Sequence, residues 1–276
     1  MDLYTTTSYE LSERITLRYS TSFSKSSRLF SAKIRPHIFA IYGLVRIADE
    51  IVDTYDGPDK QAQLDALERE TYHALKVGYS TNPIVHSFAC TATAYGIRKE
   101  LIDPFFKSMR MDLTPQNYNE SLYQKYIYGS AEVIGLMCLR VFSENTQTTY
   151  AQLESGAKAL GAAYQKVNFL RDIASDYKER GRVYFPNVQF ESFSDSEKET
   201  IITDIQADFS AAKPYIDKLP KNARKAVGLS YAYYHELLKK LAATPVHHLK
   251  QQRIRLSNIQ KAHIALAHFR LEKGDQ

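Results

Sequence analysis

Apolar residues recur every three to four positions along most of the chain, which is the period of a helix with one buried face. Alternation with a period of two is rare, so the pattern predicts an all-α protein. Prolines mark most of the expected boundaries; Asn82-Pro83, for example, is typical of a helix cap followed by the first helical residue. The predicted helices cover residues 7–24, 36–55, 59–77, 83–109, 116–143, 146–179, 194–218, 221–242 and 246–271.

A few places need separate predictions. Pro104 should break a helix or start one. Pro214 falls inside the helix predicted over residues 194–218 and should kink it, because proline lacks the N–H that a helix interior uses. Residues 183–190 could form a short extended segment. No repeat, low-complexity tract or long linker separates the helices, so residues 1–276 are expected to form a single all-α domain.

The composition is that of a globular protein, with 44% hydrophobic and 24% charged residues. The formal net charge is +5, from 36 basic and 31 acidic residues. This mild excess suits an anionic substrate or an anionic membrane surface and does not indicate nucleic-acid binding. Cys90 and Cys138 lack the spacing of a metal site, so free thiols in a reducing compartment are expected.

Neither a signal peptide nor a membrane-spanning helix is expected. The first residues, MDLYTTTSYELSER, lack the apolar core of a signal peptide. No apolar run approaches the length of about 18 residues that a spanning helix needs, and the longest, residues 38–45, ends at Arg46. These features predict a cytoplasmic protein that could associate peripherally with the inner face of a membrane.

Two of the predicted helices carry a pair of aspartates four residues apart. Asp49 and Asp53 form the first pair, and Asp172 and Asp176 form the second. This spacing places both side chains on one helix face, where like charges cost about 0.2–0.5 kcal/mol. One such pair is usually a solvated face. Two pairs, each in an apolar helix beside an arginine, favour a face that binds cations.

Carboxylate oxygens at this spacing suit a hard divalent cation. Mg²⁺ typically takes one or two carboxylates per ion, keeps some water, and takes its other ligands from substrate phosphates. Two aspartate pairs facing each other across a cavity would therefore bind a diphosphate through bridging ions. Asn168 and Gln165 lie on roughly the same helix face as the second pair and could assist.

Three further segments have two interpretations each. Residues 20–30, STSFSKSSRLF, are rich in hydroxyl groups, which can donate to phosphate oxygens or cap a helix. Residues 126–135, YIYGSAEVIG, contain two glycines that let a helix or a ligand approach the backbone, and Tyr128 could face a cavity or the core. The Gly- and Ala-rich residues 155–164 suit close helix packing or the wall of an apolar tunnel.

The last predicted helix is basic. Arg253 and Lys261 are eight residues apart, about two turns, so they are expected on one face. They could reach a diphosphate or form a solvated basic surface. No glycine-rich phosphate loop, nucleophile motif or Cys/His cluster is visible in the sequence.

These segments together resemble the squalene and phytoene synthases, most closely the bacterial phytoene synthases. SFSKSSRLF followed by AIYGLVRIADEIVD is similar to the first aspartate-rich region of that family. QKVNFLRDIASDYKERGRVYFP is similar to its second region with the Arg-Tyr-Phe-Pro tail. The resemblance extends from Ser20 to Lys261. It implies the isoprenoid synthase fold, in which helices surround a central apolar cavity.

The resemblance also implies roles for individual residues. Mg²⁺, or Mn²⁺ as a substitute, would be bound by Asp49, Asp53, Asp172 and Asp176 with the help of Asn168. The diphosphates would be contacted by Ser20, Ser22, Arg46, Gln165, Arg171 and Arg253. The reaction cavity near the departing groups would be lined by Tyr42, Tyr128 and Tyr234. Direct catalytic roles would belong to the four aspartates, Tyr128 and Arg171.

One position departs from the family pattern. Many members have Ala-Gly-Thr-Val-Gly where this chain has Ala131-Glu132-Val133-Ile134-Gly135. Glu132 therefore places a carboxylate near the expected cavity wall. Whether this carboxylate faces substrate, a basic residue or water stays open at this stage.

The reaction implied by the resemblance joins two identical allylic diphosphates head to head through a cyclopropyl intermediate. C20 substrates would give phytoene for carotenoid biosynthesis, which is the preferred prediction. C15 substrates would give dehydrosqualene or squalene, and NADPH would be needed only for squalene. The expected partners are prenyl diphosphates and a peripheral membrane surface, with no nucleic acid.

Two other classes of protein share part of this pattern. A non-catalytic assembly protein of the same fold would be free to lose acids from either pair, whereas all four are present. An all-α nucleotide pyrophosphohydrolase also uses acidic helices with Mg²⁺, but it needs no long apolar tunnel. A prenyltransferase is therefore the favoured prediction.

Overall fold

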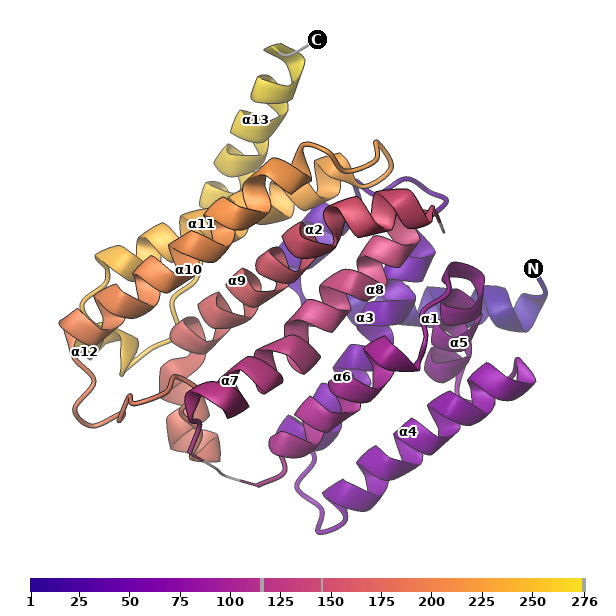
Figure 1. Cartoon of the computed structure of the whole chain (residues 1–276), viewed down its shortest axis with the longest axis horizontal. Helices are drawn as coiled ribbons and strands as arrows, with labels where there is room; N and C mark the ends of the chain where they lie inside the picture. Colours follow the sequence, from indigo (N-terminus) through magenta and orange to yellow (C-terminus); the bar gives the residue numbers. More distant parts are fainter. Residues whose placement is uncertain (115–116, 145, 275–276) are drawn as a thin grey trace.

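The computed structural model describes residues 1–114, 117–144 and 146–274, with the side chains of residues 21–23 and 271–274 outside the described part. Every regular element in these ranges is helical, which confirms the predicted all-α class (Figure 1). The α-helices are α1 (Leu3–Tyr19), α2 (Thr21–Ser27), α3 (Arg35–Asp49), α4 (Lys60–Val77), α5 (Pro83–Tyr95), α6 (Lys99–Met111), α7 (Glu120–Ile127), α8 (Val133–Phe142), α9 (Gln147–Arg180), α10 (Asp195–Ile216), α11 (Arg224–Ala243), α12 (Val246–Leu249) and α13 (Asn258–Gly274). Two π-helical turns are η1 (Glu50–Thr54) and η2 (Tyr128–Glu132).

Four of the predicted helices each contain two α-helices in the structure, and in one of them, predicted over residues 116–143, α7 and α8 are joined by η2. Residues 7–24 divide at Ser20 into α1 and α2. Residues 83–109 divide at Gly96, whose left-handed backbone (φ 65°) ends α5 and is adopted by glycine without strain. Residues 246–271 divide into α12 and α13. The breaks at Ser20 and at residues 250–253 are polar, but each is short enough to fall on the solvent face of a continuous helix, so the hydrophobic period alone did not locate them.

Two predictions about irregular positions were wrong. Pro104 neither starts nor breaks a helix, because α6 begins at Lys99 and continues through it. Residues 183–190 form turns and irregular structure rather than an extended strand. Pro214 lies inside α10, which ends at Ile216.

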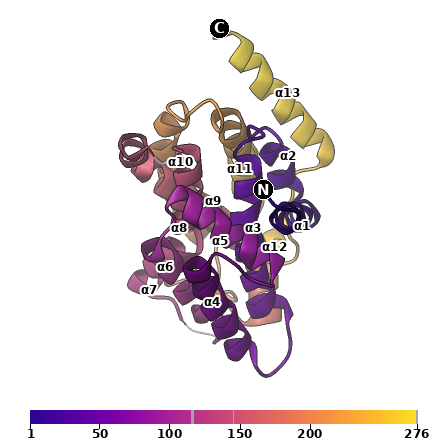
Figure 2. The ribbon, with the colours of Figure 1, turned by 90° about the vertical axis from the view of Figure 1, so that its right-hand side faces the viewer.

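The 34-residue helix α9 is central to the arrangement. Helix α10 packs along one side of α9, and α8 with η2 packs along another (Figure 1). Helix α3 packs against α1 and α5 and also contacts α8. Helix α13 contacts α11 and projects from the body at the C-terminal end (Figure 2).

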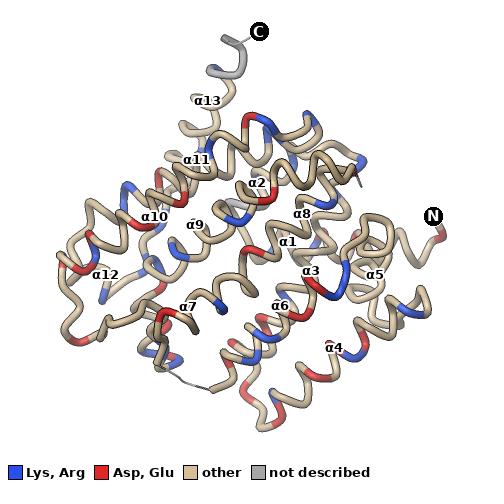
Figure 3. The backbone as a smooth tube through the Cα atoms, in the orientation of Figure 1, with Lys and Arg blue, Asp and Glu red and all other residues tan. Residues whose placement is uncertain are grey.

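Buried apolar residues form two clusters. The first is built mainly from α3, α5, α6 and α8, and the second mainly from α7, α9, α10 and α11. Charged residues of both signs alternate along outer helices such as α4 (Figure 3). Among the described residues, no helix has the length and apolarity needed to cross a bilayer.

The two π-helical turns lie next to the segments that the sequence analysis singled out. Turn η1 continues α3, so Asp49 is the last residue of the α-helix and Asp53 lies in the wider π turn. Turn η2 joins α7 to α8. Such π insertions are rare in helices and occur frequently at functional sites.

Gly129 allows η2 to pack directly on α6. A Cβ atom at this position would lie 2.1 Å from the carbonyl oxygen of Pro104 and 2.1 Å from Oγ of Ser108. Both distances are far below van der Waals contact, and one of the two atoms belongs to the backbone. The close approach of these two helical segments therefore requires glycine.

Replacing Gly129 by alanine is expected to lower the free energy of unfolding by about 1–3 kcal/mol, because the new methyl group forces the two segments apart. Urea unfolding followed by circular dichroism measures this. Ser210→Ala, on the exposed face of α10, serves as the control and should change stability by no more than about 0.5 kcal/mol. Equal stability of Gly129→Ala and the unchanged protein would contradict the packing described here.

Candidate active site

A cavity of about 1410 Å³ lies between α3, α8, α9, α10 and α11. A pocket for one drug-sized ligand is typically about 300–1,000 Å³, so this space suits a larger ligand or two ligands. Its polar lining comes from the C-terminal parts of α3 and α9 with η1, and its apolar lining comes largely from the preceding parts of these helices and from their neighbours. Apolar lining residues include Phe30, Ile41, Leu139, Phe142, Leu153 and Leu219.

Small residues of α9 serve both of the uses that the sequence suggested. Gly156, Ala157 and Gly161 line the cavity. A Cβ atom on Gly161 would lie 2.8 Å from the carbonyl oxygen of Ala131, and one on Gly156 would lie 2.3 Å from the Tyr215 side chain. The same stretch therefore lets η2 and α10 pack closely and leaves an apolar space beside them.

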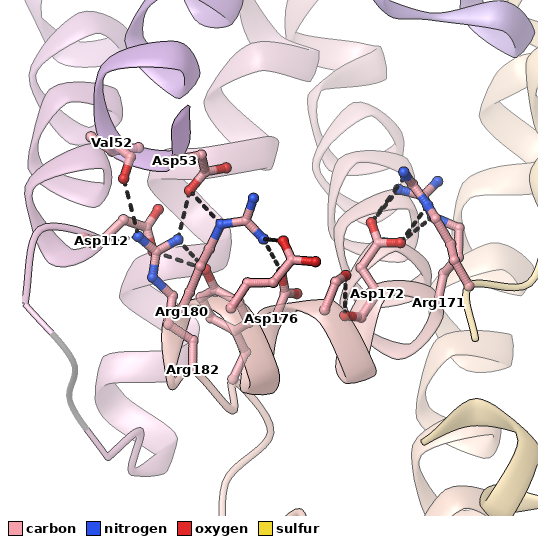
Figure 4. A network of polar contacts seen from close by, with 12 residues as sticks. Val52, Asp53, Asp112, Arg171, Asp172, Asp176, Arg180 and Arg182 are labelled. Carbon is pink, nitrogen blue, oxygen red and sulfur yellow. Dashed lines mark hydrogen bonds and ion pairs between the residues drawn. The ribbon is translucent and has the colours of Figure 1, made fainter. Parts of the chain in front are cut away.

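The two aspartate pairs come together at the polar part of the cavity, where Figure 4 shows Asp53 of the first pair beside Asp172 and Asp176 of the second. Asp53 and Asp176 share one arginine, because Nε of Arg180 lies 3.5 Å from Asp53 Oδ1 and its Nη1 lies 3.4 Å from Asp176 Oδ1. Asp49 and Asp172 line the same cavity. Two segments that are distant in sequence thus present four carboxyl groups to one space.

Asp172 is contacted by two arginines. Arg171 donates to both of its oxygens, from Nε at 2.9 Å and from Nη2 at 2.6 Å (Figure 4). Arg253 donates from Nη2 to Oδ2 at 3.1 Å, and its Nε lies 2.6 Å from Oδ1. Paired contacts of this kind fix the orientation of a carboxylate. Arg253 precedes α13, so the C-terminal segment closes over the second aspartate pair.

The negative charges of Asp49 in the first pair and Asp176 in the second pair are only partly compensated by arginines. Burial, and then the charge of Asp53, raise the pKa of Asp49 from 3.8 to about 7. Burial, and then the charge of Asp172, raise the pKa of Asp176 to about 7 as well. Nearby arginines oppose both shifts but do not cancel them. An added cation beside these groups would therefore be stabilised.

These side chains fit divalent cations that are shared with a bound phosphate. Aspartate and asparagine oxygens are the donors that Mg²⁺ prefers. Within residues 1–114, 117–144 and 146–274, no group of three or more His, Cys, Asp or Glu side chains is arranged to hold an ion by itself. Since Mg²⁺ commonly takes one or two carboxylates and completes its shell from water and substrate, this arrangement suits ions that arrive with a diphosphate.

Most of the other predicted site residues also line the cavity. The hydroxyl of Tyr234 donates to Oδ1 of Asn168 at 3.3 Å, and its ring stacks on Tyr164 with centroids 4.0 Å apart. This stack orients the Asn168 amide beside the second aspartate pair. The side chain of Ser22 lies outside the described part of α2. The predicted residues found in the lining, besides the four aspartates, are Ser20, Tyr42, Arg46, Gln165, Asn168, Arg171, Tyr234 and Arg253.

Tyr128 was predicted to face the cavity, and this placement was wrong. Tyr128 is not among the lining residues, whereas Tyr126 is. Two positions along an α-helix change the direction of a side chain by about 200°, so only one of the two tyrosines can point inward. Glu132 is outside the lining too. Burial raises the pKa of Glu132, and the charge of Lys158 opposes this shift.

Arg253 and Lys261 do not share a helix face, contrary to the prediction. Arg253 lies in the connection between α12 and α13, and Lys261 lies in the first turn of α13. Both nevertheless line the cavity. The break within residues 246–271 is the reason that the helical spacing did not apply.

Sequence reasoning missed a buried group beside Asp53. Arg182 donates to Asp53 Oδ1 at 2.7 Å (Figure 4). Asp112 accepts hydrogen bonds from the hydroxyls of Tyr126 at 2.6 Å and Tyr184 at 2.9 Å. Burial raises the pKa of Asp112 to about 6, and Arg182 opposes this rise. The Arg-Val-Tyr-Phe-Pro stretch of residues 182–186 was a usable signal for Arg182 and Tyr184, but a lone acid after a helix carries no pattern.

Comparison with known proteins identifies the family. The family model described as squalene/phytoene synthase matches residues 16–260. The chain belongs to the squalene/phytoene synthase family. Membership confirms the predicted enzyme class, a prenyltransferase. It excludes the alternative prediction of a nucleotide pyrophosphohydrolase.

Curated relatives of this family include enzymes with different products. The 15-cis-phytoene synthase of Synechococcus elongatus is 31% identical over 259 residues, which cover 83% of this chain and 82% of that protein. The 4,4′-diapophytoene synthase of Staphylococcus haemolyticus is 26% identical over 205 residues, covering 72% of this chain and 70% of that protein. These two relatives belong to the same family, but their names give different products.

Solved structures in the family share the fold. A dehydrosqualene synthase in complex with a ligand has a TM-score of 0.82 at 19% identity, and the match covers 98% of both chains. A squalene synthase, HpnC of Alicyclobacillus acidocaldarius, has a TM-score of 0.75 at 20% identity, covering 92% of this chain and 98% of that one. These matches confirm the isoprenoid synthase fold predicted from the sequence.

The raised pKa of Asp176 predicts a pH-dependent effect of Asp176→Asn in buffer with a metal chelator. The folded state binds a proton more tightly than the unfolded state between about pH 4 and 7, so the free energy of unfolding falls as the pH rises through this window. Asparagine does not ionise and avoids this fall. Asp176→Asn should therefore be more stable than the unchanged protein at about pH 8, by on the order of 1 kcal/mol, and nearly equal at about pH 5.

Urea unfolding at the two pH values measures the difference. Asp217→Asn, an exposed aspartate just after α10, should show no pH-dependent gain. If Asp176→Asn is no more stable than the unchanged protein at about pH 8, the carboxylates do not repel each other as described.

Proposed function

We propose that the chain joins two molecules of geranylgeranyl diphosphate head to head (1–1′) to give phytoene, a step of carotenoid biosynthesis. One observation carries this proposal: two aspartate pairs that share Arg180 border the polar part of a large apolar cavity. A prenyl diphosphate has the same division, with an anionic head and a long apolar chain. A cavity larger than a typical single-ligand pocket supports two substrates.

The choice of C20 substrates is supported by the phytoene synthase relative, whose 31% identity extends over four fifths of both chains. The alternative is a pair of C15 farnesyl diphosphates, which would give dehydrosqualene, or squalene if NADPH supplied a hydride. The 4,4′-diapophytoene synthase and dehydrosqualene synthase relatives favour that alternative.

The residues of the polar part would bind the diphosphate heads and stabilise the charge that develops on the leaving group. Mg²⁺, or Mn²⁺ in its place, would be bound by Asp49, Asp53, Asn168, Asp172 and Asp176 and would supply positive charge against the departing diphosphate. Arg171 and Arg253 line the cavity next to Asp172 and could donate to phosphate oxygens.

Loss of diphosphate from the first substrate leaves an allylic cation in the apolar part of the cavity. A double bond of the second substrate attacks this cation, and loss of a proton gives a cyclopropyl diphosphate. Loss of the second diphosphate gives a second cation, and rearrangement of this cation followed by loss of a proton gives the 1–1′ linked hydrocarbon. The apolar walls exclude water, which would quench either cation. This chemistry needs no nucleophilic side chain.

Incubation with each prenyl diphosphate in the presence of Mg²⁺, followed by extraction of hydrocarbons, tests the reaction and the chain length together. We expect phytoene from the C20 substrate. A C30 hydrocarbon made only from the C15 substrate would establish the alternative, and no hydrocarbon from either would exclude the proposed function.

Asp172→Asn is expected to lower the turnover rate by about 100-fold or more, because it removes a charge from the group that binds the diphosphate and its ions. The variant should stay folded, since asparagine keeps the shape of the side chain. Glu132→Gln is the matched control, because Glu132 does not line the cavity, and its turnover rate and product should be unchanged. A fully active Asp172→Asn variant would remove the role assigned to the second pair.

We also propose that the C-terminal part of the chain contacts an anionic membrane surface, from which an amphiphilic substrate could enter. No acidic residue lies between Glu236 and Glu272, whereas lysines and arginines recur in this stretch (Figure 3). Ile259 and Leu266 of α13 are 70% and 55% exposed. Basic residues near a membrane contribute about 1 kcal/mol each, and exposed apolar side chains add to this.

The chain should therefore sediment with vesicles of equal parts phosphatidylglycerol and phosphatidylcholine at low salt and be released at high salt. Leu266→Asp should weaken sedimentation severalfold, because it places a negative charge at the lipid surface. Leu3→Asp changes another exposed leucine, in α1, and serves as the control. Failure of the unchanged protein to sediment at low salt would contradict this surface.

A further inference from the structure

Arg182 links the first aspartate pair to a second, buried acid. Its Nη1 donates to Asp53 Oδ1 at 2.7 Å, and its Nη2 donates to the backbone carbonyls of Asp112 at 2.5 Å and Val52 at 3.4 Å (Figure 4). The Asp112 carboxylate lies 3.7 Å from the same guanidinium. Arg182 is only 8% exposed, so its charge is compensated by these groups rather than by bulk water.

Asp112 is itself held in one orientation. It follows α6 and is 6% exposed. The hydroxyl of Tyr126 donates to its Oδ2 and that of Tyr184 donates to its Oδ1. The two tyrosine rings lie 4.9 Å apart between centroids, so the donors belong to one packed group. A buried carboxylate with two hydroxyl donors and one facing cation has few ways to reorient.

The chain places Arg182 here through a glycine turn. Gly181 ends α9 with a left-handed backbone (φ 65°), which favours glycine. After this turn the backbone N–H of Arg182 donates to the carbonyl oxygen of Asp176 at 3.0 Å. The same residue therefore contacts Asp176 through its backbone and Asp53 through its side chain. It connects the two aspartate pairs.

Both arginines that reach Asp53 contact the same oxygen. Arg182 and Arg180 lie 2.7 and 3.5 Å from Oδ1. Within the described part of the chain, the side-chain hydrogen bond that Asp53 accepts comes from Arg182 and ends on Oδ1. Arg182 thus fixes this oxygen of Asp53 at the edge of the cavity.

We propose that Asp112 is a positioning residue that, through Arg182, sets how strongly Asp53 binds a divalent cation. Asp112 shares the charge of Arg182, which weakens the hold of Arg182 on Asp53. Without that negative charge Arg182 would pair with Asp53 alone and would compete with a cation for the carboxylate. This inference rests on the proposed function for the identity of the cation site, and it assigns Asp112, which also lines the cavity, an effect on Asp53 through Arg182.

The test is the binding of Mn²⁺ in the presence of inorganic diphosphate, followed by electron paramagnetic resonance, with the full chain. Asp112→Asn keeps the size of the side chain and removes its charge. We expect Mn²⁺ to bind about tenfold more weakly, which is the usual lower limit for changing a residue that orients a metal ligand. The Mg²⁺ concentration that gives half-maximal turnover should rise by a similar factor.

A matched control separates this role from a structural one. Asp208→Asn changes a partly buried carboxylate that lies 2.8 Å from the buried ammonium of Lys166, away from the cavity lining. This variant should lose stability but bind Mn²⁺ as the unchanged protein does. An Asp112→Asn variant with unchanged Mn²⁺ affinity, whatever its unfolding temperature, would overturn the inference.

Tyr184→Phe decides the matter if Asp112→Asn does not fold. It removes the hydrogen bond that Tyr184 donates to Asp112 and the longer one that it accepts from Arg182, at 3.4 Å, but leaves both charges, so Mn²⁺ binding should weaken by less, about threefold. Unchanged binding in this variant would also overturn the inference. Because Mn²⁺ and inorganic diphosphate are the probes, the comparison remains valid even if the unchanged protein converts no prenyl diphosphate, which would contradict the proposed function alone.

Discussion

Repulsion among carboxylates is the constraint on which the polar part of this cavity depends. Four aspartates stand where apolar walls limit the screening that water would give, so each charge acts strongly on its neighbours. Arginines offset this repulsion unevenly: Asp172 has two direct partners, while Asp49 and Asp176 keep strongly raised pKa values. The remaining negative charge makes this part of the cavity receptive to cations.

The same helix supplies both this charge and the apolar wall. Helix α9 carries the second aspartate pair near its C-terminal end and a run of small residues nearer its N-terminal end. The glycines in that run let η2 and α10 approach the α9 backbone, and the neighbouring small side chains leave room for an apolar chain. A ligand with a charged head and a long apolar tail would therefore meet a charged surface and an apolar surface along this one helix.

Precision at the polar part comes from groups beyond the aspartates. The Gly181 turn directs Arg182 toward Asp53, and Asp112 with its two tyrosines limits the movement of Arg182. Arg182, Asp112 and the two tyrosines come from three separate segments of the chain, and all four are buried. A buried polar network whose members are paired is rigid, and rigidity is what a site for positioned charges requires.

The sequence by itself determined the helical class, the two aspartate pairs, their proximity to arginine and the family. Each of these is a local property, because a spacing of four and a period of 3.6 specify a helix face without reference to the rest of the chain. Only the tertiary structure decided that Tyr126 and not Tyr128 lines the cavity, that Glu132 points away from it, and that Asp112 stands behind Asp53. The direction in which a helix face points, and the distant residue that meets it, depend on how all the helices pack, and no local pattern contains that information.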